Sequence, residues 1–153
     1  MLSQSGIHAI RAMVTLAALP PDEYCGVAVI ATATGSPRNY LGKLLLQLSR
    51  HGLVDSRTGL GGGFRLSQPA DRVRLFDIMA AIEDAGRWTE CAFTNNACSD
   101  VTPCMVHARW SRVREAFLTF LRDTTIAELA TNHQQIETLN ANAQKMRALS
   151  KRS

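Results

Sequence analysis

The spacing of its helix-breaking residues is the feature that most limits how this chain can fold. Pro20 and Pro21, then Gly35, then Gly52 bound three segments with helical apolar periodicity, at residues 5–19, 27–34 and 36–51. In the third segment, Ser36 is expected as the N-cap and Pro37 occupies a position where proline favours a helix start. A two-turn helix followed at once by a longer helix is typical of a helix-turn-helix.

Two short strands are expected directly after these helices. They cover residues 53–57 and 64–66, and the connection from Thr58 to Gly63 contains four glycines, which permit positive backbone dihedrals and a close approach to a ligand. A nucleotide-binding loop is disfavoured because no Gly-Lys-Ser/Thr sequence follows. The sequence therefore predicts a mainly α fold with a small β-hairpin wing, that is, a winged helix-turn-helix.

The rest of the chain divides into three parts. After a helix at 75–82, residues 83–103 lack apolar periodicity and form a segment longer than loops usually are unless they have a function. A long helix follows at about 105–122, with an apolar seam suited to dimerisation, and a capping box at Thr125 to Glu128 starts a last helix. We predict a DNA-binding domain at 1–82, a ligand-binding loop at 83–104, dimerisation helices at 105–140 and a disordered basic tail at 141–153.

Length and charge exclude several classes of protein. A chain of 153 residues suits one domain rather than a large multidomain enzyme, and its first apolar stretch contains His8 and Arg11, unlike a membrane span or signal peptide. We therefore expect a cytoplasmic protein with no membrane partner. Residues 36–74 hold seven basic and two acidic residues, a concentration typical of proteins that bind a phosphate backbone.

The positions expected to contact double-stranded DNA follow from this fold. In the third helix they are Arg38, Asn39, Tyr40 and Lys43, near the half that would enter the major groove. In the wing they are Arg57, Thr58, Gly59 and Gly61, beside the phosphates.

Three of the four cysteines and one histidine cluster late in the chain. Cys91, Cys98, Cys104 and His107 are separated by six, five and two residues, and thiolate and imidazole are the donors that bind iron–sulfur clusters or zinc. An iron–sulfur cluster is favoured because zinc ligands are usually closer together in sequence, whereas metal-free redox thiols and a zinc site stay open. Cys25 lies far from this set and is expected to be a small apolar filler.

No convincing catalytic site is present, so we do not expect an enzyme. A small redox or electron-transfer protein is the competing interpretation, although the chain has no Cys-x-x-Cys pair. A third interpretation keeps the regulator and makes the cysteines a thiol switch or a zinc site.

With these motifs in this order, the sequence resembles the family of winged-helix regulators typified by the iron–sulfur cluster regulator IscR. The resemblance runs from Leu2 to about Thr138 and is carried best by residues 59–64, 104–110 and 125–129. It implies a homodimeric bacterial transcription factor that binds an iron–sulfur cluster and reads palindromic operators. We expect this protein to be a repressor that senses iron, redox state or nitric oxide.

The resemblance also implies a ligand set. Cys91, Cys98, Cys104 and His107 match the three-cysteine, one-histidine pattern of the branch that binds a 2Fe-2S cluster. A 4Fe-4S centre is less expected, because relatives with an acidic fourth ligand carry it where this chain has Ile7. Thr58 stands where the wing commonly has arginine, and Gly42 replaces an acidic residue, so the operator sequence does not transfer.

Overall fold

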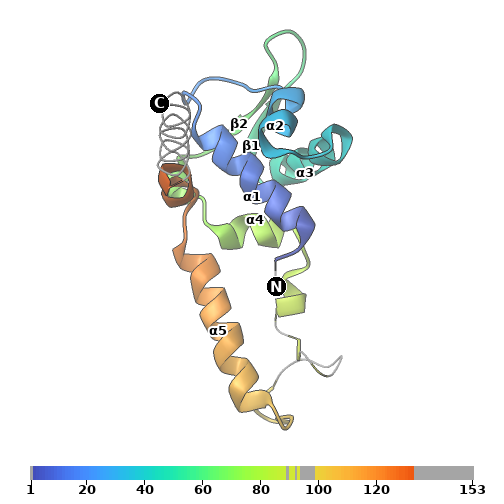
Figure 1. Cartoon of the computed structure of the whole chain (residues 1–153), viewed down its shortest axis with the longest axis vertical. Coiled ribbons are helices and arrows are strands. Elements are labelled where there is room, and N and C mark those ends of the chain that lie inside the picture. Colours follow the sequence, from blue (N-terminus) through green and yellow to red (C-terminus); the bar gives the residue numbers. More distant parts are fainter. Residues whose placement is uncertain (1, 89, 92, 94–98, 133–153) are drawn as a thin grey trace, which may run out of the picture.

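The computed structural model describes residues 2–88, 90–91, 93 and 99–132. Three helices come first, α1 (Gln4–Ala17), α2 (Val27–Thr34) and α3 (Arg38–Arg50), followed by strands β1 (Val54–Arg57) and β2 (Gly63–Leu66). Next come the 3-10 turn η1 (Ala70–Arg72), helix α4 (Leu75–Ile82), the 3-10 turn η2 (Ala85–Trp88) and helix α5 (His107–Asp123), as Figure 1 shows. Residues 126–132 are helical again. The prediction of a mainly α winged helix is confirmed.

The core forms where the apolar faces of α1 to α4 meet. The predicted stripe of α3 is buried at every position, Leu41, Leu44, Leu45 and Leu48. It packs with Met13 of α1, Ile30 of α2 and Ile78 of α4, all of which are fully buried. Each such side chain contributes about 1.5–3 kcal/mol on burial, so this core fixes how the three N-terminal helices lie relative to one another.

The start of α3 differs from the prediction. Pro37, not Ser36, is the N-cap residue, and no side chain caps the helix. Ser36 is buried, and its hydroxyl is engaged by His8 of α1 and Thr34 of α2 instead. Ser36 was therefore wrongly predicted as the N-cap, because a tertiary hydrogen-bond network uses its side chain.

The wing is an antiparallel hairpin whose register pairs Val54 with Leu66 and Arg57 with Gly63. A third segment joins its outer edge. The backbone N–H of Cys25 donates to the Phe64 carbonyl over 2.8 Å, and the Phe64 N–H donates back to the Cys25 carbonyl over 2.9 Å. The hairpin is therefore attached to the loop that precedes α2, which the sequence did not indicate.

Helix α5 extends away from the other helices (Figure 1). It begins at His107, two residues later than predicted, and only Leu118 and Leu121 in it are buried. The residues that follow α5 are joined to the start of α4 and the residues before it, since Leu75 donates its N–H to the Thr124 carbonyl (3.0 Å) and Ile126 donates to the Val73 carbonyl (2.9 Å).

The capping box predicted after α5 is confirmed. The Thr125 N–H donates to Glu128 Oε2 over 2.7 Å, and the Glu128 N–H donates to the Thr125 hydroxyl over 3.3 Å. The predicted basic tail at 141–153 lies outside the described residues. In the described part of the chain, no helix combines the length and apolar character needed to cross a membrane.

Candidate nucleic-acid interface and cysteine site

The face of α3 that points away from the core carries the predicted contact residues. Arg38, Asn39 and Lys43 are exposed. Leu46, which follows Lys43 by one turn on this face, is 47% exposed. Such a surface offers cationic and amide groups for phosphates and base edges, and an apolar group of the kind that contacts thymine methyls.

Tyr40 is held differently from its neighbours. Its hydroxyl forms a hydrogen bond with the hydroxyl of Ser5 in α1, and its ring lies edge-on to the His8 ring, 5.8 Å between centroids. The side chain is 37% exposed. Tyr40 is thus tied to α1 as well as placed at the predicted interface.

The wing presents one arginine and a tip that is open to solvent. Arg57 Nη2 donates to the Gly61 carbonyl over 3.0 Å, and its guanidinium lies 4.7 Å from the centroid of the Tyr24 ring. Thr58, Gly59 and Gly61 are exposed, and both glycines have positive φ, 88° and 70°. The hydrogen bond to Gly61 holds the cation of Arg57 along the tip, where a phosphate could meet it.

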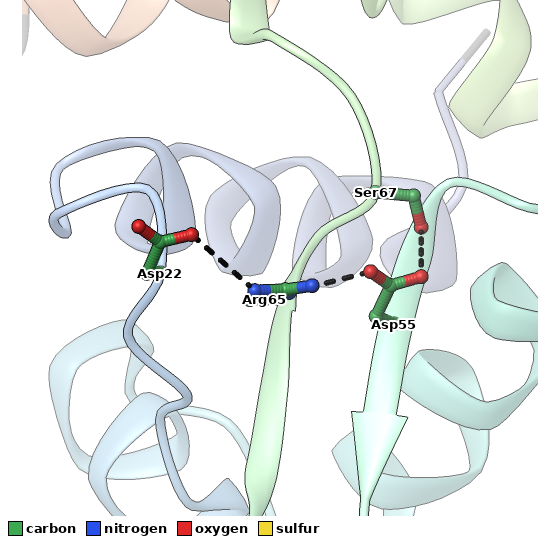
Figure 2. A network of polar contacts seen from close by, with 4 residues as sticks. All are labelled: Asp22, Asp55, Arg65 and Ser67. Atoms are coloured by element: carbon green, nitrogen blue, oxygen red, sulfur yellow. Dashed lines mark hydrogen bonds and ion pairs between the residues drawn. The ribbon is translucent and has the colours of Figure 1, made fainter.

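The second wing arginine is neutralised. Arg65 Nε lies 3.3 Å from Asp55 Oδ2 and its Nη1 lies 3.7 Å from Asp22 Oδ1, while Ser67 donates to the other Asp55 oxygen (Figure 2). Because a carboxylate lies on either side of it, this guanidinium adds little to the positive electrostatic potential at the surface of the wing, where a phosphate would bind. The free positive charge of the wing is therefore that of Arg57.

Sequence reasoning missed Tyr24. Its ring has Arg57 at 4.7 Å and Arg65 at 4.8 Å, so one aromatic side chain contacts both wing arginines. Tyr24 precedes the wing by about thirty residues and no local pattern connects them. Only the pairing of Cys25 with Phe64 brings them together.

The structure brings two of the four predicted metal ligands together. Cys91 Sγ and Cys104 Sγ are 3.5 Å apart, and Cys91 is buried. His107, the first residue of α5, has its Nε2 2.7 Å from Asp100 Oδ1. Cys98 lies outside the described residues. Within the part of the chain that is described, no three histidine, cysteine or acidic side chains are grouped closely enough to hold a metal ion.

The spacing of these two sulfurs fits a shared metal. Two thiolates bound tetrahedrally to one ion at about 2.3 Å are roughly 3.8 Å apart. The observed 3.5 Å is close to that separation. Nearby, the indole N–H of Trp110 donates to the Glu90 carbonyl over 3.3 Å, so α5 is linked to the residue before Cys91.

Cys25 stands apart from this pair. It is buried in the core beside the wing, as expected of an apolar filler, and burial raises the pKa of its thiol. A thiol with a raised pKa is a poorer nucleophile and metal ligand at neutral pH.

Comparison with known proteins decides the family. Residues 2–132 match the model of the Rrf2 family, described as iron-dependent transcriptional regulators. The chain belongs to the Rrf2 family. It is a DNA-binding transcriptional regulator, not an enzyme.

Individual Rrf2-family relatives agree with this assignment. A helix-turn-helix-type transcriptional regulator of Aquifex aeolicus is 34% identical over 122 residues, which cover 77% of this chain and 85% of the relative. IscR of Yersinia pseudotuberculosis is 29% identical over 136 residues, which cover 89% of this chain and 82% of that IscR. The resemblance to IscR-like regulators is confirmed.

Solved structures of Rrf2-family proteins have the same fold. CymR, the global cysteine regulator of Bacillus subtilis, superposes with a TM-score of 0.73 at 26% identity, covering 86% of this chain and 97% of CymR. IscR of T. potens superposes with a TM-score of 0.70 at 22% identity, covering 89% of this chain and 90% of that IscR.

Proposed function

We propose that this Rrf2-family regulator is a homodimeric repressor that binds palindromic operators and senses iron, redox state or nitric oxide through a 2Fe-2S cluster. The observation that carries the proposal is the 3.5 Å separation of Cys91 Sγ and Cys104 Sγ at the start of α5. Because operators lie on the bacterial chromosome, we place the protein in the cytoplasm.

The ligand set would be Cys91, Cys98, Cys104 and His107. Thiolates suit iron–sulfur clusters, and an imidazole in place of one thiolate raises the reduction potential. Asp100, whose Oδ1 lies 2.7 Å from Nε2 of His107, would fix the orientation of the imidazole that holds the metal. The cluster, when bound, would supply a redox centre whose potential depends on these ligands and their hydrogen bonds.

The DNA-binding surface would combine α3 with the wing. Exposed residues of α3 would enter the major groove, namely Arg38, Asn39, Tyr40 and Lys43, and Arg57, Thr58, Gly59 and Gly61 of the wing would lie beside phosphates. In a symmetric dimer, two such surfaces read half-sites about 34 Å apart, which is one turn of the duplex.

The dimer would form along α5. Val113 is 47% exposed and Phe120 is 46% exposed, and Phe117 between them is half-buried. Phe117 packs partly against the core, whereas Val113 and Phe120 leave about half of their surface open in the described chain, and a second copy of α5 carries the matching seam.

The experiment that tests cluster binding is anaerobic purification followed by iron and acid-labile sulfide analysis and a visible spectrum. We expect bound iron and sulfide in equal amounts, with absorption that Cys98→Ala and His107→Ala each bleach or alter. Cys25→Ala is the matched control and should keep the spectrum, because Cys25 lies in the core away from the pair. Colourless, iron-free protein, or unchanged spectra in both ligand variants, would contradict the proposal.

The same sulfur pair favours one alternative, a regulator without a cluster that works by thiol oxidation. Cys91 and Cys104 are near enough to form a disulfide when an oxidant such as hydrogen peroxide accepts two electrons and two protons. Thiol titration of iron-free protein before and after peroxide decides between the two. If operator affinity changes in proportion to the loss of two thiols in protein that never held iron, the alternative is correct.

A further inference from the structure

The N-terminal turn of α1 is hydrogen-bonded to Glu83, the first residue of the segment 83–104 that contains three of the cysteines. We call these residues the cysteine segment. Glu83 directly follows α4 and opens residues 83–104. Its Oε1 accepts the backbone N–H of Ser3 over 3.3 Å and also contacts the Ser3 hydroxyl. Ser3 is the N-cap of α1, and its hydroxyl accepts the Gly6 N–H over 3.0 Å. One serine therefore connects the start of α1 to the end of α4.

This contact is close because position 6 has no side chain. A Cβ on Gly6 would lie 2.5 Å from Met79 Sδ and 3.2 Å from Glu83 Oε1. The Glu83 carboxylate also lies at the positive end of the α1 dipole, which stabilises the contact. A shift of Glu83 therefore has to move α1, or else break these hydrogen bonds.

The first two turns of α1 also hold the start of the recognition helix α3. The Ser5 hydroxyl bonds the Tyr40 hydroxyl, and the His8 ring lies edge-on to the Tyr40 ring. His8 Nδ1 is 2.6 Å from the Ser36 hydroxyl, which Thr34 also contacts. Tyr40 and Ser36 flank Arg38 and Asn39, so these contacts set the pose of the side chains that would read bases.

We propose that the first two turns of α1 couple the cysteine segment to the recognition helix α3. A change in the cysteine segment would shift Glu83, and Glu83 would shift α1 through Ser3. Ser5 and His8 would then act as positioning residues for the start of α3. The inference rests on the proposed function. A ligand shifts DNA affinity only by favouring one arrangement of the protein. The path from Glu83 through α1 to Tyr40 is a continuous set of hydrogen bonds and helix backbone that can carry such a preference.

A second contact between α4 and α3 bypasses α1 and provides the control. Gln47 Nε2 donates to the Ala81 carbonyl over 2.9 Å. It joins the C-terminal half of α3 to the same end of α4. If coupling used this direct route, Gln47→Ala would remove it and changes in α1 would not.

The first measurement is hydrogen exchange in the purified full-length protein without DNA. Ser3→Ala and Glu83→Ala should each speed exchange of the backbone amides at 41–44 by about two- to tenfold, the range expected for loss of one hydrogen bond. Glu83→Gln keeps an acceptor oxygen and should restore slow exchange, and Gln47→Ala should leave the first turn of α3 unchanged. Unchanged exchange in Ser3→Ala and Glu83→Ala would overturn the proposal.

The second measurement is the ratio of operator affinities before and after a chelator removes iron. We expect Ser3→Ala and Glu83→Ala to bring this ratio towards one, and Glu83→Gln and Gln47→Ala to keep the wild-type ratio. In iron-free protein, Ser5→Ala and Tyr40→Phe should each weaken operator binding, and the double variant should bind no more weakly than either. A ratio lost in Gln47→Ala but kept in Ser3→Ala would overturn the coupling. A wild-type ratio of one would instead overturn the proposed sensing, before any variant is compared.

Discussion

Gly63 lies so close to the backbone of Cys25 that a Cβ at position 63 would overlap the Cys25 carbonyl group. Its φ is 138°, which L side chains rarely adopt. Gly63→Ala should therefore destabilise the protein by about 1–3 kcal/mol, because the backbone contact has no flexible atom that could yield. Urea unfolding followed by circular dichroism measures the change.

Gly26→Ala is the control for this prediction. Gly26 has φ of −66°, and nothing lies within 4 Å of a Cβ built there. If both variants lose equal stability, the close approach of Gly63 to Cys25 is not the cause.

The second prediction concerns Tyr24. Removing its ring frees Arg57 and Arg65 from a contact worth about 0.5–1 kcal/mol at exposed sites. We expect Tyr24→Ala to weaken operator binding severalfold, because Arg57 then loses its fixed direction, while Tyr24→Phe keeps the ring and near-normal binding. Fluorescence anisotropy with a labelled operator measures both. Equal losses in the two variants would show that the hydroxyl, not the ring, matters.

Sequence patterns predicted what depends on neighbours in the chain and missed what depends on tertiary contacts. The bounds of α2 and α4 agree with those predicted because Gly35 ends one helix with a left-handed residue and apolar periodicity defines the other. Ser36, Tyr24 and Glu83 acquire their roles from partners more than twenty residues away. The cysteine cluster was visible in the sequence, but only the fold could place Cys91 against Cys104.

The third prediction concerns phosphate contacts. In a plot of log affinity against log salt concentration, Lys43→Ala should reduce the slope by about 2, because the proposed dimer loses one phosphate contact in each subunit and each neutralised phosphate releases about one counterion. Arg122→Ala is the control, since Arg122 pairs with Glu115 in α5, 3.8 Å away, and should leave the slope unchanged. A slope that Lys43→Ala leaves intact would remove Lys43 from the interface.

The fourth prediction concerns the α5 seam. Val113→Glu or Phe120→Glu would bury a carboxylate at the proposed dimer contact, and an unpaired buried charge is strongly unfavourable. We expect sedimentation to show a 16.7 kDa species in place of a dimer twice that mass. Thr119→Glu, also exposed and about 100° around α5 from Phe120, should remain dimeric. A dimer that persists in both seam variants would place the interface elsewhere.

The last prediction concerns the capping box after α5. Hydrogen bonds from the Thr125 N–H and hydroxyl lower the pKa of Glu128, since they favour its ionised form. A pKa lower in the folded than in the unfolded state means that the ionised carboxylate stabilises the fold above the unfolded pKa. This contribution is lost as the pH falls through the folded value. Thr125→Ala removes the hydroxyl contact and should raise the Glu128 pKa, seen as a shifted carboxyl titration by NMR. Thr131→Ala is the control, because it removes only a hydrogen bond to the Ala127 carbonyl and should leave the Glu128 pKa unchanged. An equal pKa shift in both variants would mean that the Thr125 hydroxyl does not stabilise the Glu128 carboxylate.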